Sequence, residues 1–228
     1  MVFRSRSIPA QSLKISVGLS LIKQVRSHRH LGVFFNETLT WTDHINHVLT
    51  KASPKLGLLR RLRGRLPRLI IRDLYLSCIL PSLEYGSVAW CGLSSTDATR
   101  LEKFNRAAGR LIANVSPASH TPHNIILARA GLQTLVSPRQ VLQISFANRV
   151  LHGCLPRHIL LATTSWRPAE LSPQTMVLRS CDNVRLPRPK KNCLKTSPLF
   201  VFFSLFSALP SELKKNLTKA KVRAFFFT

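Results

Sequence analysis

The spacing of apolar residues changes once along this chain, near residue 42, and that change constrains the fold more than any other feature. Before it, residues 13–17 alternate apolar and polar side chains and Gly18 follows them, which is typical of a β-hairpin; residues 31–35 form a further short strand. After it, apolar residues recur at every third or fourth position, as on one face of a helix. The pattern predicts an α+β chain that is mainly α.

Three helices are predicted in the middle of the chain. Thr42 is the predicted N-cap of the first, and Pro54 should kink or divide that helix. Pro67 suits the first turn of the second helix. The third begins with a segment that resembles a capping box, Ser94 to Asp97, and has the clearest division into an apolar and a basic face.

Composition divides the chain into three regions. Residues 1–36 form the small N-terminal β hairpin and strands, residues 37–155 a helical bundle, and residues 156–228 a Pro-rich, basic linker with a loop-rich C-terminal segment. Residues 199–209 are the most apolar run, but a bilayer span needs about 20 residues. We therefore expect that run to be a buried strand or core segment.

The charge of the chain is strongly unbalanced. Lys and Arg number 34 against only 9 Asp and Glu, which gives a formal net charge of +25. A compact chain with this charge repels itself unless a polyanion neutralises it. Nucleic acid is the first candidate partner, and an anionic membrane surface is the second.

Several classes of chemistry have no support in the sequence. No two acidic residues are adjacent, whereas two-metal phosphoryl transfer needs converging carboxylates. The five cysteines form no C-x-x-C, which indicates reduced thiols in an intracellular protein, nuclear or cytoplasmic. Close pairs such as His120/His123 lack a second matching pair, and no local catalytic motif is present. We predict no catalytic residue, metal, cofactor, small-molecule substrate or membrane partner.

Basic residues gather on the predicted helices in two groups. Few acids are available to pair with them, so we favour contact with a phosphate backbone over a merely solvated face. The first group follows the first helix into the start of the second, and the other forms the basic face of the third. The candidate nucleic-acid-binding residues are Lys51, Lys55, Arg60, Arg61, Arg63, Arg65, Arg68 and Arg72, with Arg100, Lys103, Arg106 and Arg110.

Four aromatic residues could in principle stack on bases: Trp41, Tyr75, Tyr85 and Trp90. Each lies within an apolar stretch of sequence. Packing in the core is therefore the favoured prediction for all four.

Ordered motifs across the chain resemble one family. Leu31-Gly32-Val33 is followed by Leu39-Thr40-Trp41 and His44-Ile45, and further on by Leu83-Glu84-Tyr85-Gly86. This succession resembles the region downstream of the catalytic palm in reverse transcriptases of non-LTR retrotransposons of the LINE type, similar to Jockey elements. The resemblance departs from the family pattern at Asn105, where Gln is expected, and at residues 206–210, where the Trp and Asn of a Trp-Asn-x-Leu-Pro motif are replaced.

The resemblance implies the end of the palm in residues 1–36, a thumb-like helical bundle in residues 37–155 and the C-terminal region beyond. The family's Tyr-x-Asp-Asp motif and endonuclease lie upstream of these segments, so the chain is expected to be a truncated RNA-directed DNA polymerase without activity of its own. Thumb helices of the family grip template–primer duplex, which implies residual, non-specific binding of RNA or DNA. The alternative is a domesticated nucleic-acid-binding or interaction module without an enzymatic role.

Overall fold

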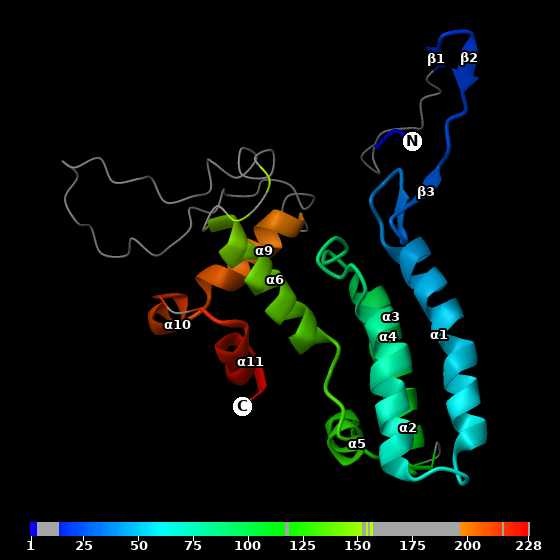
Figure 1. Cartoon of the computed structure of the whole chain (residues 1–228), viewed down its shortest axis with the longest axis vertical. Helices are drawn as coiled ribbons and strands as arrows, with labels where there is room; N and C mark the ends of the chain where they lie inside the picture. The colour runs from blue at the N-terminus through cyan, green and yellow to red at the C-terminus, as the bar shows by residue number, and fades with distance from the viewer. Residues whose placement is uncertain are drawn as a thin grey trace, which may run out of the picture. The chain divides into compact units, whose positions relative to one another are not determined.

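The computed structural model describes residues 1–3, 14–116, 119–151, 154, 156, 197–215 and 217–227 (Figure 1). The strands are β1 (Ile15–Val17), β2 (Ser20–Ile22), β3 (Ser27–His30) and β4 (Val33–Asn36). The helices are α1 (Thr42–Leu62), α2 (Arg68–Leu74), the π-helical turn η1 (Tyr75–Ile79), α3 (Leu80–Glu84), α4 (Ser95–Ile112), α5 (His123–Ala130), α6 (Val136–Leu151), α9 (Pro198–Ser207), α10 (Ser211–Lys215) and α11 (Lys219–Phe227). Residues 157–196, most of the predicted linker, lie outside the described residues.

The structure confirms a mainly helical α+β fold with small antiparallel hairpins at the N-terminus. β1 and β2 pair as predicted, with Ile15 opposite Ile22, and Gly18 lies in the turn at a φ of +60°, a conformation that glycine adopts without strain. β4 corresponds to the further strand predicted at residues 31–35. Its partner β3 is not among the predicted strands, because Ser27–His30 is polar and shows no apolar alternation.

The sequence predicts that Pro54 kinks or divides the first helix; α1 continues through Pro54, so the proline does not divide it. Thr42 is also not the N-cap: it is the first helical residue, and Trp41 occupies the cap position without a side-chain cap hydrogen bond. Ile45, Ala52 and other residues at helical spacing form the buried face of α1. Because one face of α1 is buried, most polar residues between these positions lie on the side that faces solvent.

The second predicted helix is a longer path made of α2, η1 and α3, and it does not end at Pro81. Pro81 is the second residue of α3 and follows directly on the π-helical turn. In the preceding π-helical turn the Leu80 N–H donates to the Tyr75 carbonyl, five residues back. The turn leaves both Tyr75 and Ile79 fully buried.

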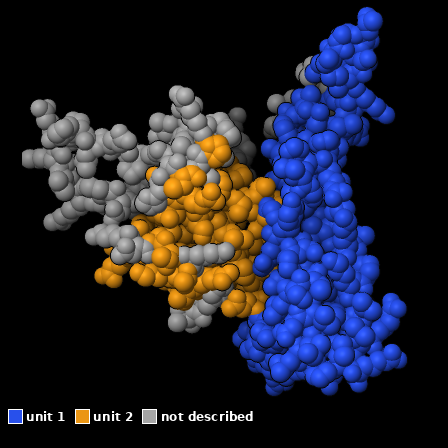
Figure 2. Space-filling view, viewed as in Figure 1, with its two compact units in different colours: residues 1–86, 93–132 blue, residues 87–92, 133–228 orange. Residues whose placement is uncertain are grey.

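The chain forms two compact units, coloured in Figure 2. Unit 1 holds residues 1–86 and 93–132, and unit 2 holds residues 87–92 and 133–228. Helix α6 thus belongs with the C-terminal helices of unit 2, whereas composition groups it with the helices before it. Within the described residues, no helix is both long and apolar enough to cross a membrane.

The core of unit 1 lies between α1, the α2–η1–α3 path, α4 and α5. Its fully buried side chains come from each of the first three, among them Ile45, Leu83 and Leu101. Helix α5 ends at Gly131, which has a φ of +64° in the left-handed region favoured at helix C-termini.

The core of unit 2 is built from α6, α9 and α11. The apolar run at residues 199–209 is a core segment as predicted, but it is a helix and not a strand. Phe202, Phe203 and Phe206 bury themselves in this core because positions i, i+1 and i+4 share one side of a helix. Trp90 is fully buried in unit 2, with the Arg139 guanidinium 4.9 Å from its ring centroid.

Candidate nucleic-acid interface

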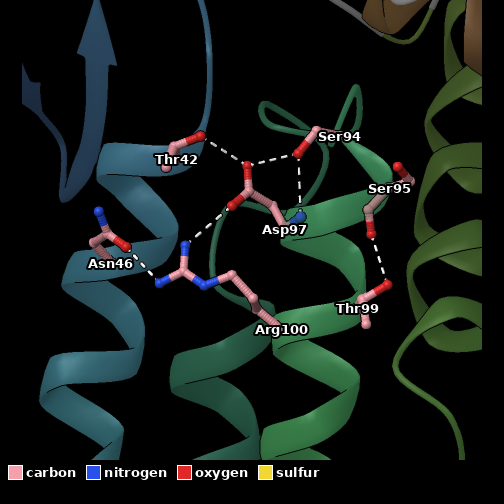
Figure 3. Close-up of polar contacts among 7 residues, drawn as sticks. All are labelled: Thr42, Asn46, Ser94, Ser95, Asp97, Thr99 and Arg100. Carbon is pink, nitrogen blue, oxygen red and sulfur yellow. Dashed lines mark hydrogen bonds and ion pairs between the residues drawn. The ribbon is translucent and has the colours of Figure 1, made fainter.

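A buried carboxylate joins the starts of α1 and α4 (Figure 3). Asp97 is only 3% exposed, and its Oδ2 accepts hydrogen bonds from Thr42 Oγ1 and Ser94 Oγ, both at 2.9 Å. Its N–H donates to Ser94 Oγ at 3.1 Å, which confirms the predicted N-cap of α4. The Thr42 hydroxyl therefore links two helices.

A second link holds the far ends of the same two helices. The Arg63 guanidinium, just beyond α1, donates to Asn114 Oδ1, just beyond α4. Near the starts, Arg100 of α4 donates to Asn46 Oδ1 of α1 and to Asp97 Oδ1. The N-terminal ends of α1 and α4 are linked to each other, and so are their C-terminal ends, so the two helices run parallel. Basic residues near their C-terminal ends therefore lie at the same end of unit 1.

The structure separates the predicted basic residues into two sets. In the first set, the side chains are exposed and make no hydrogen bond or ion pair with any other described residue. We call this set the open cations. The open cations are Lys51, Arg60, Arg61, Arg65, Arg68 and Lys103.

The other residues of the α1–α2 group are engaged within unit 1. Lys55 Nζ donates to the Cys78 carbonyl at 3.0 Å and to Ser82 Oγ at 3.3 Å, which holds α1 against the α2–η1–α3 path. Arg72 Nε donates to the Gly131 carbonyl at 3.1 Å, at the end of α5. Both cations thus donate to backbone carbonyls of other elements of unit 1.

The predicted basic face of α4 is mostly engaged as well. Arg110 donates to the carbonyls of Ser116 at 2.6 Å and Ser119 at 3.0 Å and so orders the loop after the helix. Arg106 Nε donates to His123 Nδ1 at 3.2 Å, which ties α4 to α5. Together with Arg100 they leave Lys103 as the open cation of α4. Three of the four predicted contact residues on this helix thus donate to acceptors within unit 1, and their contact with nucleic acid stays a prediction.

The open cations are concentrated where α1 passes into α2. Described ion pairs of the unit involve Arg72 with Asp73, Arg100 with Asp97 and His123 with Glu102, and none reaches an open cation. Exposed leucine and isoleucine side chains lie among these cations in the sequence; Leu58, Leu69 and Ile70 are 53%, 67% and 45% exposed. The junction thus presents positive charge that no described carboxylate neutralises.

A buried hydrogen bond between η1 and α4 was not predicted. The Tyr75 hydroxyl donates to Asn105 Oδ1 at 2.8 Å, and both side chains are at most 1% exposed. Burial, then Glu102 and Glu84, raises the pKa of the Tyr75 phenol well above its ordinary value. The signal available in the sequence was an Asn on the apolar side of α4, where a buried amide requires a partner.

Two histidines of α1 differ in their surroundings. Burial, and next the charge of His47, lowers the pKa of His44 to about 4, and its Nδ1 accepts from the Phe34 N–H at 3.4 Å. The pKa of His47 is also lowered, by burial first and then by Lys51 and Arg29. Both shifts favour the neutral imidazoles, so the positive charge of this region is carried by Lys and Arg.

Three of the four aromatic predictions are confirmed and one is wrong. Trp41, Tyr75 and Trp90 are buried. Tyr85 is 58% exposed, because it follows α3 at the surface and its hydroxyl donates to the Leu31 carbonyl at 2.9 Å. Among the described aromatics of the predicted set, Tyr85 alone presents a ring to solvent.

Reactive groups are sparse in the parts of the chain that the structure describes. Cys78, Cys91 and Cys154 are free thiols, and burial raises the pKa of Cys91 to about 12. No cluster of three or more His, Cys, Asp or Glu side chains in these parts could hold a metal ion. Comparison with protein-family models, with curated proteins and with solved structures finds no match to the chain.

Proposed function

We propose that this chain binds RNA or DNA without sequence specificity, through the phosphate backbone, at the junction of α1 and α2. The observation that carries the proposal is the set of open cations there, exposed and without a described partner. Lys and Arg side chains at such a surface bind phosphates by ion pairing and by release of condensed counterions.

The resemblance of the sequence to the thumb of non-LTR reverse transcriptases supports the same proposal independently of the geometry. The family's thumb is helical, and the motif residues Leu39 and Trp41 directly precede α1 while His44 lies in its first turn. On this reading the chain is a non-catalytic remnant of an RNA-directed DNA polymerase, and its partner is template–primer duplex.

A folded interaction module without an enzymatic role is the second candidate. The observation in its favour is that unit 1 closes a core of its own, with Ile45, Leu83 and Leu101 completely buried. Such a module unfolds cooperatively, whereas a fragment deprived of its packing partner aggregates. A urea titration followed by circular dichroism distinguishes the two.

The test is a salt titration of the full chain with a fluorescent RNA–DNA duplex. Replacing Arg60, Arg61, Arg65 and Arg68 together with Gln removes four open cations. We expect affinity to fall about 100-fold at low salt and the slope of log K against log salt to become shallower by about 3 to 4 units.

A matched control removes the same charge elsewhere. The residues Arg129, Arg149, Lys221 and Arg223 are exposed and lie outside the junction; their replacement with Gln should change affinity less than about fivefold. Equal losses in the two quadruple variants, or no binding by the parent chain at low salt, would refute the proposed interface. Metal-dependent primer extension by the purified chain would refute the non-catalytic reading.

A further inference from the structure

The β1–β2 hairpin exposes apolar side chains on both of its faces. Val17, Leu19 and Leu21 have relative exposures of 67%, 108% and 69%, and every other residue of the two strands is exposed as well. Val17 pairs with Ser20 and Leu21 with Ser16, so Val17 and Leu21 point to opposite faces, with Leu19 in the turn between the strands. Ile15 and Ile22, which pair with one another, share the face of Val17 and are 50% and 48% exposed. Exposed apolar side chains therefore lie on both faces of the hairpin and at its turn.

Charge is arranged around the hairpin and not on it. Residues 15–22 carry no charge, while Lys14 and Lys23 stand directly outside the two strands and Arg26 follows. No acidic residue occurs before Glu37. The hairpin is therefore uncharged and apolar, and cations flank it on both sides. This arrangement fits a partner with an apolar interior and an anionic surface.

We propose that the β1–β2 hairpin inserts its tip into the surface of an anionic lipid bilayer, with the cations at its base against the headgroups. Strands of three residues extend for about 10 Å, similar to the 5–10 Å depth of interfacial insertion. This is surface binding and not a membrane span. It goes beyond the proposed nucleic-acid binding and does not depend on it.

Other anionic or apolar partners fit the hairpin less well. Nucleic acid would place phosphates or base edges against Val17, Leu19 and Leu21, which have nothing to donate to them. A second copy of the chain would bring the same cations to the contact, and their repulsion opposes pairing. The inference departs from the sequence-based expectation of no membrane partner, because the structure leaves both faces of this apolar hairpin exposed.

The first experiment is cosedimentation of the full chain with vesicles of phosphatidylcholine alone or with phosphatidylserine. The test variant is the pair Leu19→Ser and Leu21→Ser. Its matched control is the pair Leu58→Ser and Leu69→Ser, two exposed leucines that lie beside open cations. We expect partitioning onto phosphatidylserine vesicles to fall about tenfold or more in the hairpin variant and less than about twofold in the control.

The second experiment measures insertion itself, because a basic chain can adsorb to anionic vesicles without it. Leu19→Trp should show blue-shifted emission and quenching by lipids brominated in the acyl chains, relative to the parent chain with its native tryptophans. Leu58→Trp should show neither effect. Lys14→Gln and Lys23→Gln should each weaken partitioning about fivefold.

Three results would overturn the inference. Equal losses in the two leucine pairs would mean adsorption by charge alone, and an unquenched Trp at position 19 would mean no insertion. Self-association without vesicles that the hairpin serines abolish would assign the tip to a second copy. Duplex binding of the hairpin serine variant is measured in parallel and should equal that of the parent, so that failure of this inference and failure of the nucleic-acid proposal are told apart.

Discussion

Two regions of unit 1 carry the same kind of residue but use it differently. At the α1–α2 junction, Arg60, Arg61 and Arg65 reach solvent without a described partner, whereas on α4 the residues Arg100 and Arg110 bind acceptors of neighbouring elements. The difference comes from what surrounds each helix. Helix α4 has α1 on one side and a loop folded back at its end, and both offer carbonyl, amide or carboxylate oxygens. The comparison shows that the same type of residue is engaged where the fold brings acceptors beside it and stays open where it does not.

The largest effect is expected at the carboxylate that aligns α1 and α4. Asp97→Ala leaves the Thr42 and Ser94 hydroxyls and the Arg100 guanidinium without this acceptor, so the free energy of unfolding should fall by about 3–4 kcal/mol. Urea denaturation measures it. Asp43→Asn is the control on exposed α1 surface and should cost below about 1 kcal/mol. A small loss in Asp97→Ala would mean that α4 does not depend on this link.

Acid should lower the free energy of unfolding while leaving the Lys and Arg side chains of both regions charged. Because the pKa of folded His44 is lowered from 6.5 to about 4, the unfolded chain binds more protons between these values. The contribution of neutral His44 to the free energy of unfolding is fully present above pH 6.5. It is lost as pH falls toward 4, by up to about 3 kcal/mol. Stability measured against pH in the parent and in His44→Leu tests this; the variant should lack this part of the slope, and His120→Gln should keep it.

The buried hydroxyl of Tyr75 is expected to matter less than the carboxylate, because it is a neutral group. Tyr75→Phe leaves the Asn105 carbonyl oxygen without that donor in the core and should cost about 1–2 kcal/mol of unfolding free energy. A double-mutant cycle with Asn105→Leu measures the coupling directly. Independent, additive losses would show that the two side chains do not depend on one another.

The smallest effect is expected when an open cation and an engaged cation are each replaced. Arg61→Gln should change the unfolding free energy by less than about 0.5 kcal/mol, because an open cation holds nothing in place. Arg110→Gln removes the donor to the Ser116 and Ser119 carbonyls and should cost about 1 kcal/mol. Thermal unfolding of the two variants measures the difference. Equal effects would remove the distinction between engaged and open cations.

Local pattern was enough to predict part of this fold. The Gly18 hairpin and the Ser94 cap of α4 depend on a few neighbouring residues, and both were predicted. The apolar run with Phe202 was predicted to be core, but its helical form was not, since a continuous apolar run carries no periodicity to distinguish helix from strand. The path through Pro81 was missed because a π-helical turn has no simple sequence signal.

For the candidate interface, the sequence by itself determined that the chain is basic, which helices carry the charge and how few acids could neutralise it. Only the tertiary structure decided which cations remain open, because the acceptors of Lys55, Arg72 and Arg110 are contributed by other segments, in most cases distant in the sequence. It also decided that the β1–β2 hairpin keeps both faces exposed. Charge and periodicity are properties of local sequence, whereas the partner that a side chain finds depends on which elements the fold brings beside it.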